Sequence, residues 1–333
     1  MIVRILNIVA VFAFLSGVTG LSHASQGTTR THTLEEMRIK YAGPASQFVD
    51  IEGINVHYRD EGEGPVVLLM HGTLGDLSDW DEWTQVLKKH FRVVRFDLPG
   101  FGLTADIANG NYSVSRSHVL IDGLMDHLGA ESFAVVGISY GGMVMFRYAA
   151  TRTERVTAMV LINSAGIQRG KRAKPANDAK LDKRSKAKTN IFIDPVVMRE
   201  DVEAFYQSYI NDPDRRSPEL IQRKLDLLNI KGRDKLSVAA YKLYEAGHPQ
   251  RVLSHVKAPS LIMWGTDNQA LDTETANAFM DAMTSACNKK LVTFDNGGHY
   301  INVERPYETA EATKQFLMNL TSNPPKGCQK LED

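Results

Sequence analysis

The chain has 333 residues, of which 43% are hydrophobic and 23% are charged, and this composition fits one or two globular domains with a large core. Its 39 Lys and Arg residues balance its 39 Asp and Glu residues. No net field therefore predicts a nucleic acid or an anionic membrane as a partner.

Residues 1–24 have the pattern of a signal peptide. Arg4 precedes a largely apolar run over residues 5–15, and Ser22-His23-Ala24 places small residues where a signal peptidase cleaves. The apolar run is short for a membrane span, although an uncleaved N-terminal anchor is the alternative. We expect a mature chain that starts near Ser25, is periplasmic or secreted, and has no stable membrane insertion after cleavage.

The sequence contains two cysteines, Cys287 and Cys328. In an oxidising compartment they could form a disulfide that holds the C-terminal tail, residues 323–333, against the core. Two unbridged thiols are the alternative. The bridge is the prediction that follows from the expected export.

Strand and helix signals alternate along most of the chain after a polar, aperiodic linker at residues 25–45. We expect strands at 47–51, 54–59, 66–70, 92–96, 133–136, 158–162, 260–264 and 290–294, the first two forming a hairpin, and helices at 79–87, 114–128, 143–150, 195–209, 218–228, 273–283 and 306–320.

This alternation predicts an α/β protein with a doubly wound, mostly parallel sheet of eight strands. The core takes residues 46–165 and 251–322, and a helical cap at 166–250 is inserted after the sixth strand. The stretch 169–188 within it is rich in Lys and Arg, which suggests nucleic acid or anionic lipid. It has no interleaved aromatic residues, so a solvated hinge into the cap is the favoured interpretation.

A strand-like run enters the segment Gly137-Ile138-Ser139-Tyr140-Gly141, and an apolar helical pattern leaves it. A Gly-x-Ser-x-Gly pattern alone is common by chance and fits an ordinary turn. Between a strand and a helix it predicts a nucleophile elbow, in which the serine occupies a strained backbone conformation. Ser139 is therefore the predicted nucleophile.

A serine hydroxyl needs an adjacent base, and His299 follows two glycines just after the last predicted strand. The oxyanion that forms needs N–H donors from two directions. We expect these donors to be the backbone N–H groups of Tyr140, directly after the nucleophile, and of Thr73, in the loop after the third strand. His71 in that loop is expected to brace it.

Five segments carry a resemblance to a known family: His71-Gly72-Thr73; Asp97-Leu98-Pro99-Gly100-Phe101-Gly102; Gly137-Ile138-Ser139-Tyr140-Gly141-Gly142; residues 259–265; and Gly298-His299 followed by Glu304-Arg305-Pro306. In this order they resemble the α/β-hydrolase superfamily, particularly its capped esterase and lipase branch. The resemblance covers about residues 47 to 320. Relatives such as epoxide hydrolases and haloalkane dehalogenases carry aspartate at the elbow, so Ser139 argues against both.

The resemblance implies a triad acid after the seventh strand, in a Trp-Gly-x-x-Asp pattern. The chain reads Trp264-Gly265-Thr266-Asp267-Asn268 there. Strict counting puts Asn268 in the acid position, whereas a one-residue loop deletion would restore Asp267. We expect Asp267 to orient His299, with Asn268 in that position, or Asp267 as a simple turn residue, as the alternatives.

These residues predict a serine hydrolase that cleaves small or medium carboxylic esters through an acyl-enzyme, with Ser139, His299 and Asp267 as the triad. No cofactor, no metal and no nucleic-acid partner is expected, and the oligomeric state stays open. The alternatives are a carbon–carbon bond hydrolase of the ring-fission-product type and a non-catalytic ligand-binding protein of the same fold.

Overall fold

The computed structural model describes residues 30–167, 197–233 and 247–322. The predicted signal peptide, the basic stretch 169–188 and the C-terminal tail lie outside the described residues, as does Cys328. Within these described ranges, no helix is both long enough and apolar enough to cross a membrane.

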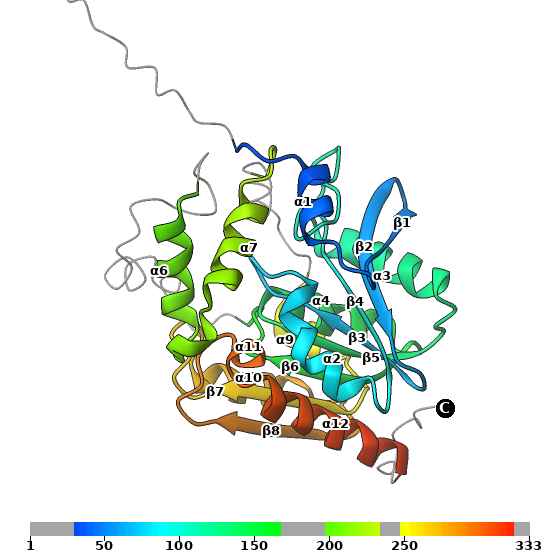
Figure 1. Ribbon diagram of the computed structural model, residues 1–333. Helices are drawn as coiled ribbons and strands as arrows, with labels where there is room; N and C mark the ends of the chain where they lie inside the picture. Colours follow the sequence, from blue (N-terminus) through cyan, green and yellow to red (C-terminus); the bar gives the residue numbers. More distant parts are fainter. Residues whose placement is uncertain (1–29, 168–196, 234–246, 323–333) are drawn as a thin grey trace, which may run out of the picture.

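The centre of the molecule is the predicted sheet of eight strands, in the order β1-β2-β4-β3-β5-β6-β7-β8 (Figure 1). Strands β1 and β2 form an antiparallel hairpin, β2 runs antiparallel to β4, and the remaining pairs are parallel. The strands are β1 (Gln47–Ile51), β2 (Ile54–Glu61), β3 (Val66–Met70), β4 (Arg92–Phe96), β5 (Phe133–Ile138), β6 (Val156–Ile162), β7 (Ser260–Gly265) and β8 (Lys289–Phe294).

Helices cover both faces of the sheet, which explains why its central strands are continuous apolar runs. The helices α2 (Asp81–Leu87) and α12 (Pro306–Ser322) pack together on one face, where Trp83 Nε1 donates a 3.0 Å hydrogen bond to Thr309. The other face carries α3 (Val114–His127), α4 (Tyr140–Thr151), α9 (Pro249–Leu253) and α10 (Thr273–Ala282).

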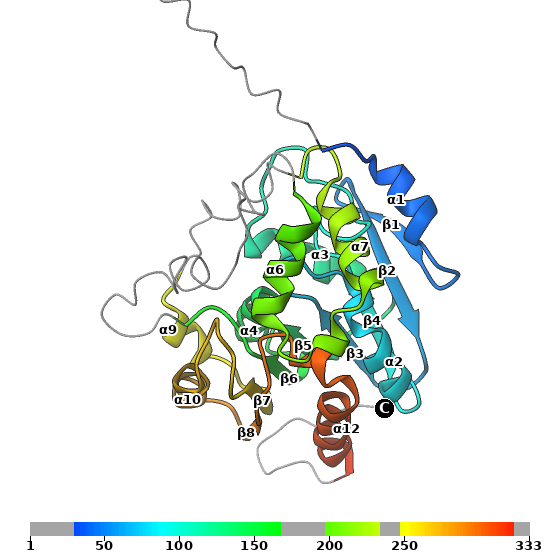
Figure 2. The ribbon, with the colours of Figure 1, turned by 60° about the vertical axis from the view of Figure 1, so that its left-hand side comes forward.

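The segment inserted between β6 and β7 contains the helices α6 (Arg199–Tyr209) and α7 (Pro218–Leu228), joined by the short helix η2 (Pro213–Arg215). We call it the α6–α7 insertion. Ser217 caps α7 through the N–H of Leu220, and Pro218 occupies its first turn. The two helices lie side by side beyond the carboxyl ends of the strands (Figures 1 and 2).

One prediction for the N-terminal region is wrong, because a helix, α1 (Leu34–Tyr41), lies within the expected linker 25–45. Thr33 and Glu36 form a reciprocal capping box at its start. Tyr41 then donates a hydrogen bond of 2.6 Å to Asp226 on α7, so α1 ties the chain entering the core to the α6–α7 insertion.

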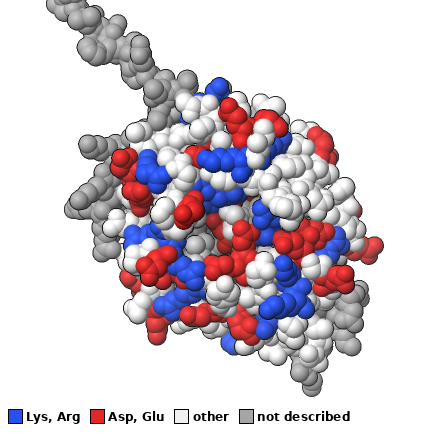
Figure 3. Space-filling view, viewed as in Figure 1, with Lys and Arg blue, Asp and Glu red and all other residues white. Residues whose placement is uncertain are grey.

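Charged side chains of both signs alternate over the face shown in Figure 3, without a broad area of a single sign. This distribution matches the balanced composition of the whole chain. It gives that face no long-range field that would attract a polyanion.

Candidate active site

Ser139 sits between the end of β5 and the start of α4 in a strained conformation, with φ 52° and ψ −118°. Non-glycine residues in such regions typically cost about 1–3 kcal/mol, and they persist where the surrounding structure enforces them. Here the Ser139 N–H donates to Ile162 at the end of β6, and the Ser139 carbonyl accepts from Ala165. The predicted nucleophile elbow is therefore present.

The elbow depends on glycines because its backbone packs directly against neighbouring backbone. A Cβ atom at Gly141 would lie 2.4 Å from the His71 carbonyl oxygen and 2.7 Å from that of Met70. One at Gly137 would lie 2.5 Å from the Gly141 carbonyl oxygen. Since these distances are far below van der Waals contact, a side chain at either position would push the elbow off the sheet.

His299 lies in the loop between β8 and α11 (Ile301–Glu304). Hydrogen bonds to the His299 backbone hold this loop from two directions. Its N–H donates to the Tyr209 carbonyl at the end of α6, at 2.8 Å. Its carbonyl accepts from the Asn163 side chain at 2.7 Å. Asn163 directly follows Ile162, the residue that receives the Ser139 N–H, so the nucleophile and base loops meet at the end of β6.

The His299 imidazole is 4% exposed and packs against the rings of Tyr209 and Tyr300, with both centroids 5.2 Å away. Burial lowers the pKa of His299 to about 3, because the apolar surroundings disfavour the charged imidazolium. The ring is therefore neutral at pH 7, the form in which it can accept a proton. Nε2 makes no hydrogen bond to another described residue.

The structure contradicts Asp267 as the partner of His299 and places Asn268 there. Asn268 Oδ1 lies 3.1 Å from His299 Nδ1, and its side chain is buried. Asp267 is exposed and accepts instead from Gln269 at 2.6 Å and Asn211 at 3.3 Å. Strict counting from Trp264 therefore gives the residue that faces His299, and no loop deletion needs to be assumed. Thr266 and Asp267 form a turn after β7, and both residues are exposed, whereas Asn268 turns into the protein.

The loop after β3 presents the first predicted oxyanion donor, the N–H of Thr73. The Gly72 carbonyl accepts from His71 Nδ1 at 2.7 Å and from Gly75 N at 3.0 Å. Because a trans peptide orients C=O and N–H in opposite directions, this fixes the Thr73 N–H pointing away from both donors. Ser139 lies close to this peptide, since a Cβ at Gly72 would be 3.1 Å from the Ser139 Cβ.

The structure thus gives His71 the bracing role that the sequence predicts. Its other ring nitrogen, Nε2, accepts from Leu98 N at 3.0 Å, so Nδ1 carries the proton. The second predicted oxyanion donor is the N–H of Tyr140, the first residue of α4, directly after Ser139. The roles of Thr73 and Tyr140 toward an oxyanion stay predictions.

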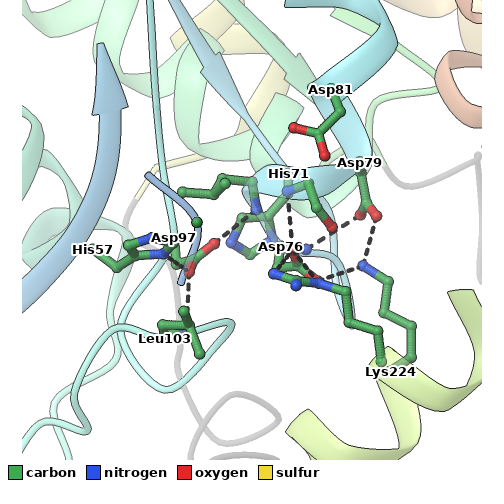
Figure 4. Close-up of polar contacts among 12 residues, drawn as sticks. His57, His71, Asp76, Asp79, Asp81, Asp97, Leu103 and Lys224 are labelled. Carbon is green, nitrogen blue, oxygen red and sulfur yellow. Dashed lines mark hydrogen bonds and ion pairs between the residues drawn. The ribbon is translucent and has the colours of Figure 1, made fainter. Parts of the chain in front are cut away.

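A buried group of charges fixes the same loop to the α6–α7 insertion (Figure 4). Lys224 Nζ on α7 lies 2.7 Å from Asp76 Oδ2 and 2.6 Å from Asp79 Oδ1, and Arg223 lies 2.9 Å from Asp76. Burial alone would raise the pKa of Asp76, but the two cations outweigh it and hold that pKa well below its usual range. For Asp79 burial dominates and raises the pKa. We call these four residues the loop–insertion cluster.

Two tyrosines complete the attachment of the loop after β3. Tyr300, next to the predicted base, donates from its hydroxyl to the Thr73 carbonyl at 2.5 Å. Tyr206 on α6 donates to the Leu74 carbonyl at 3.3 Å. The loop after β3, the loop that carries His299 and the α6–α7 insertion are therefore connected by hydrogen bonds.

Sequence reasoning missed Asn163 and the loop–insertion cluster. Asn163 has a positive φ of 41° directly after a strand, and no local sequence pattern predicts this conformation. Its amide oxygen also accepts from Gly265 N, so one side chain joins the ends of β6 and β7 to the histidine loop.

Within the described ranges, no group of three His, Cys, Asp or Glu residues is arranged to hold a metal ion.

Comparison with known proteins decides the family. The family model for the alpha/beta hydrolase fold matches residues 65–306. The chain belongs to the α/β-hydrolase family. That match spans the elbow, the loop after β3 and the histidine loop, and begins after α1.

Two curated relatives of this α/β hydrolase are named as hydrolases of different substrates. The chain is 27% identical over 288 residues to 2-hydroxy-6-oxo-6-(2'-aminophenyl)hexa-2,4-dienoic acid hydrolase of Metapseudomonas resinovorans, covering 81% of this chain and 90% of the relative. It is 26% identical over 268 residues to monoacylglycerol lipase ABHD6 of Bos taurus, covering 78% of this chain and 77% of the relative.

A solved structure shares the fold. The membrane phospholipase A described as a bacterial virulence factor superposes with a TM-score of 0.71 at 24% identity, covering 86% of this chain and 91% of that chain. At this identity the likeness establishes the fold alone. The family establishes a hydrolase, and the bond it cleaves is a matter for proposal.

Proposed function

We propose that this α/β hydrolase is a serine esterase that cleaves small or medium carboxylic esters through an acyl-enzyme. The observation that carries the proposal is the strained Ser139 at the elbow, at the same sheet edge as a buried, neutral His299. A strained, glycine-flanked serine and an uncharged imidazole are what nucleophilic attack on a carbonyl requires.

In the proposed reaction, Ser139 Oγ attacks the ester carbonyl while His299 Nε2 takes the hydroxyl proton. The N–H groups of Thr73 and Tyr140 stabilise the negative charge on the carbonyl oxygen. His299 then protonates the leaving alcohol, and the acyl group remains on Ser139. Water, deprotonated by His299, releases the carboxylic acid and restores the serine.

The surroundings of His299 favour an apolar, uncharged substrate. Phe205 and Tyr209 on α6 lie with ring centroids 4.4 Å apart, and Tyr209 contacts the His299 ring. The cations that reach the loop after β3, Arg223 and Lys224, are already paired with buried carboxylates. Apolar acyl or aromatic groups are better suited to such a site than an anion.

A carbon–carbon bond hydrolase is the second candidate, because relatives such as the Metapseudomonas enzyme cleave a dienoic acid. Such a substrate carries a carboxylate, which calls for an available cation. Of the described cations, Arg223 and Lys224 reach the loop after β3, and their pairing with Asp76 supports the ester hydrolase over this candidate.

The discriminating experiment measures kcat/KM for p-nitrophenyl esters with acyl chains of 2 to about 12 carbons, beside a 2-hydroxy-6-oxo-dienoate whose absorbance falls on cleavage. We expect ester turnover that depends on Ser139 and is lost in Ser139→Ala. Exclusive turnover of the dienoate would establish the second candidate. Binding without turnover of either substrate would establish a non-catalytic binding protein.

We also propose that the protein is exported, on the strength of residues 1–24 in the sequence. Expression of the full chain in a bacterium, followed by fractionation and intact mass measurement, tests this. A periplasmic or secreted product that begins near Ser25 supports export, whereas a full-length chain in the cytoplasm refutes it.

A further inference from the structure

An amide, rather than a carboxylate, holds the predicted base. Asn268 is only 8% exposed between β7 and α10, and its Oδ1 accepts three hydrogen bonds: from Ala270 N at 3.0 Å, from Leu271 N at 3.2 Å and from His299 Nδ1 at 3.1 Å. Its Nδ2 is buried and has no hydrogen-bond partner among the described residues. A buried, unpaired amide N–H carries a free-energy cost, so packing alone does not explain this asparagine.

The two backbone donors determine which way the amide faces. Ala270 N–H and Leu271 N–H can only donate, so the atom they approach must be the acceptor, Oδ1. A flipped amide would direct the Nδ2 hydrogens at these two N–H groups and lose both bonds. The oxygen therefore also faces His299.

This orientation decides the tautomer of the imidazole. Because Oδ1 can only accept, His299 Nδ1 must carry the proton, and Nε2 is then the unprotonated nitrogen that takes the hydroxyl proton. An unconstrained asparagine could instead turn its NH2 toward the ring and select the opposite tautomer. In chymotrypsin-like proteases, where asparagine replaces the triad aspartate, that outcome lowers turnover about 10⁴-fold.

We propose that Asn268 is the positioning residue of His299, and that Ala270 and Leu271 lock its amide so that it selects the catalytic tautomer without a carboxylate. The inference rests on the proposed function for its catalytic meaning. Its structural content, the Nδ1–H tautomer, is independent of any substrate.

The surroundings of the ring have a consequence for pH. Among the residues that the structure describes, the titratable groups around it are the phenols of Tyr209 and Tyr300, Glu304, which accepts from Gly298 N, and the exposed Asp267. None of them hydrogen-bonds to the imidazole, and burial is the cause that lowers the pKa of His299. The base therefore stays unprotonated well below pH 6, and activity should persist into acid solution.

Substituting Asn268→Asp keeps an acceptor for both backbone N–H groups and adds a negative charge beside the imidazole. A nearby opposite charge raises a histidine pKa by about 1–3 units. We therefore expect the acid limb of kcat/KM to move upward by at least about 1 pH unit. At pH 7 kcat/KM should increase, by roughly tenfold at the least, because the carboxylate stabilises the developing imidazolium.

Asp267→Asn is the matched control, since it changes the neighbouring residue, which faces solvent and makes no hydrogen bond to His299. Its pH profile should coincide with that of the wild type. Circular dichroism and the urea midpoint of each variant establish that the comparison is made between folded proteins.

Nitrogen-15 NMR of the His299 ring tests the tautomer in the wild-type protein, with His299→Gln used to assign its signals. We expect Nδ1 to be protonated and Nε2 to be unprotonated from pH 5 to 8. An Nε2–H tautomer, or an Asn268→Asp variant whose acid limb and rate equal those of the wild type, would overturn the proposal. Loss of all ester turnover with the Nδ1–H tautomer present would refute the proposed function and leave the positioning intact.

Discussion

Replacing Lys224 with methionine tests whether the loop–insertion cluster holds the fold together. The Lys224 side chain is 1% exposed and neutralises Asp76 and Asp79, which are also buried. Methionine keeps most of the side-chain volume and removes the charge. Asp76 retains Arg223, so the uncompensated charge falls mainly on Asp79.

Removing one partner of a buried ion pair typically costs about 3–5 kcal/mol, because the remaining charge stays desolvated. We expect Lys224→Met to lose this amount of unfolding free energy, which for a domain of this size lowers the melting temperature by on the order of 10 °C. The free energy of unfolding is measured in urea at pH 7.5, with Lys88→Met as the control. Lys88 is 36% exposed and 3.8 Å from Glu61, so its loss should cost less than about 0.5 kcal/mol.

The pH dependence of the loss identifies Asp79 as its cause. Without Lys224 the pKa of Asp79 in the folded state, already raised by burial, should rise further. A raised carboxyl pKa makes the folded state bind the proton more tightly, so the deficit of the variant should shrink as the pH falls from 8 to 5. The double variant Asp79→Asn, Lys224→Met should recover part of the stability. A deficit below about 1 kcal/mol, or one without pH dependence, would refute the reasoning.

Three further predictions concern other parts of the chain. Asp267→Ala should leave kcat/KM within about threefold of wild type, because its carboxylate does not reach His299; a loss of several orders of magnitude would restore it as the triad acid. Burial depresses the pKa of His299, so its contribution to the free energy of unfolding is full above pH 6.5 and decreases by about 1.4 kcal/mol per pH unit below it. The difference in unfolding free energy between wild type and His299→Gln should therefore shrink by about 2 kcal/mol between pH 7 and 5. A difference that stays constant would contradict this burial effect. If Cys287 and Cys328 are bridged, unreduced protein should contain no thiol that iodoacetamide can alkylate, and reduction should add the mass of two hydrogen atoms. Two alkylated thiols in the unreduced protein would disprove the bridge.

The sheet and its helices were largely predictable because their signals are local. Continuous apolar runs such as β3 and β4 indicate buried parallel strands, and Ser217-Pro218 indicates the start of α7. Helix α1 also had a signal, the Thr33-x-x-Glu36 capping box, which the polar composition around it obscured. Ser139 and His299 were predictable because each follows a strand within a glycine-rich turn.

The rest of the site depends on contacts between distant residues. Asn163 meets the His299 carbonyl 136 residues later, and Asp76 meets Lys224 148 residues later, and neither pairing leaves a pattern in the local sequence. The two candidates for the partner of His299, Asp267 and Asn268, are adjacent in sequence, so a shift of one residue in the loop after β7 decides between them. Counting alone favoured Asn268, and the 3.1 Å contact between its Oδ1 and His299 Nδ1 agrees with that count.

The most direct test of the account is covalent labelling of the nucleophile. The wild-type protein is treated with a fluorophosphonate, with and without excess ester substrate, and its intact mass and modified peptide are measured beside those of Ser139→Ala. We predict one phosphonyl group per chain, located on Ser139, slowed by the substrate and absent from the variant. A label on any other residue, or equal labelling of Ser139→Ala, would contradict the assignment of Ser139 as the nucleophile.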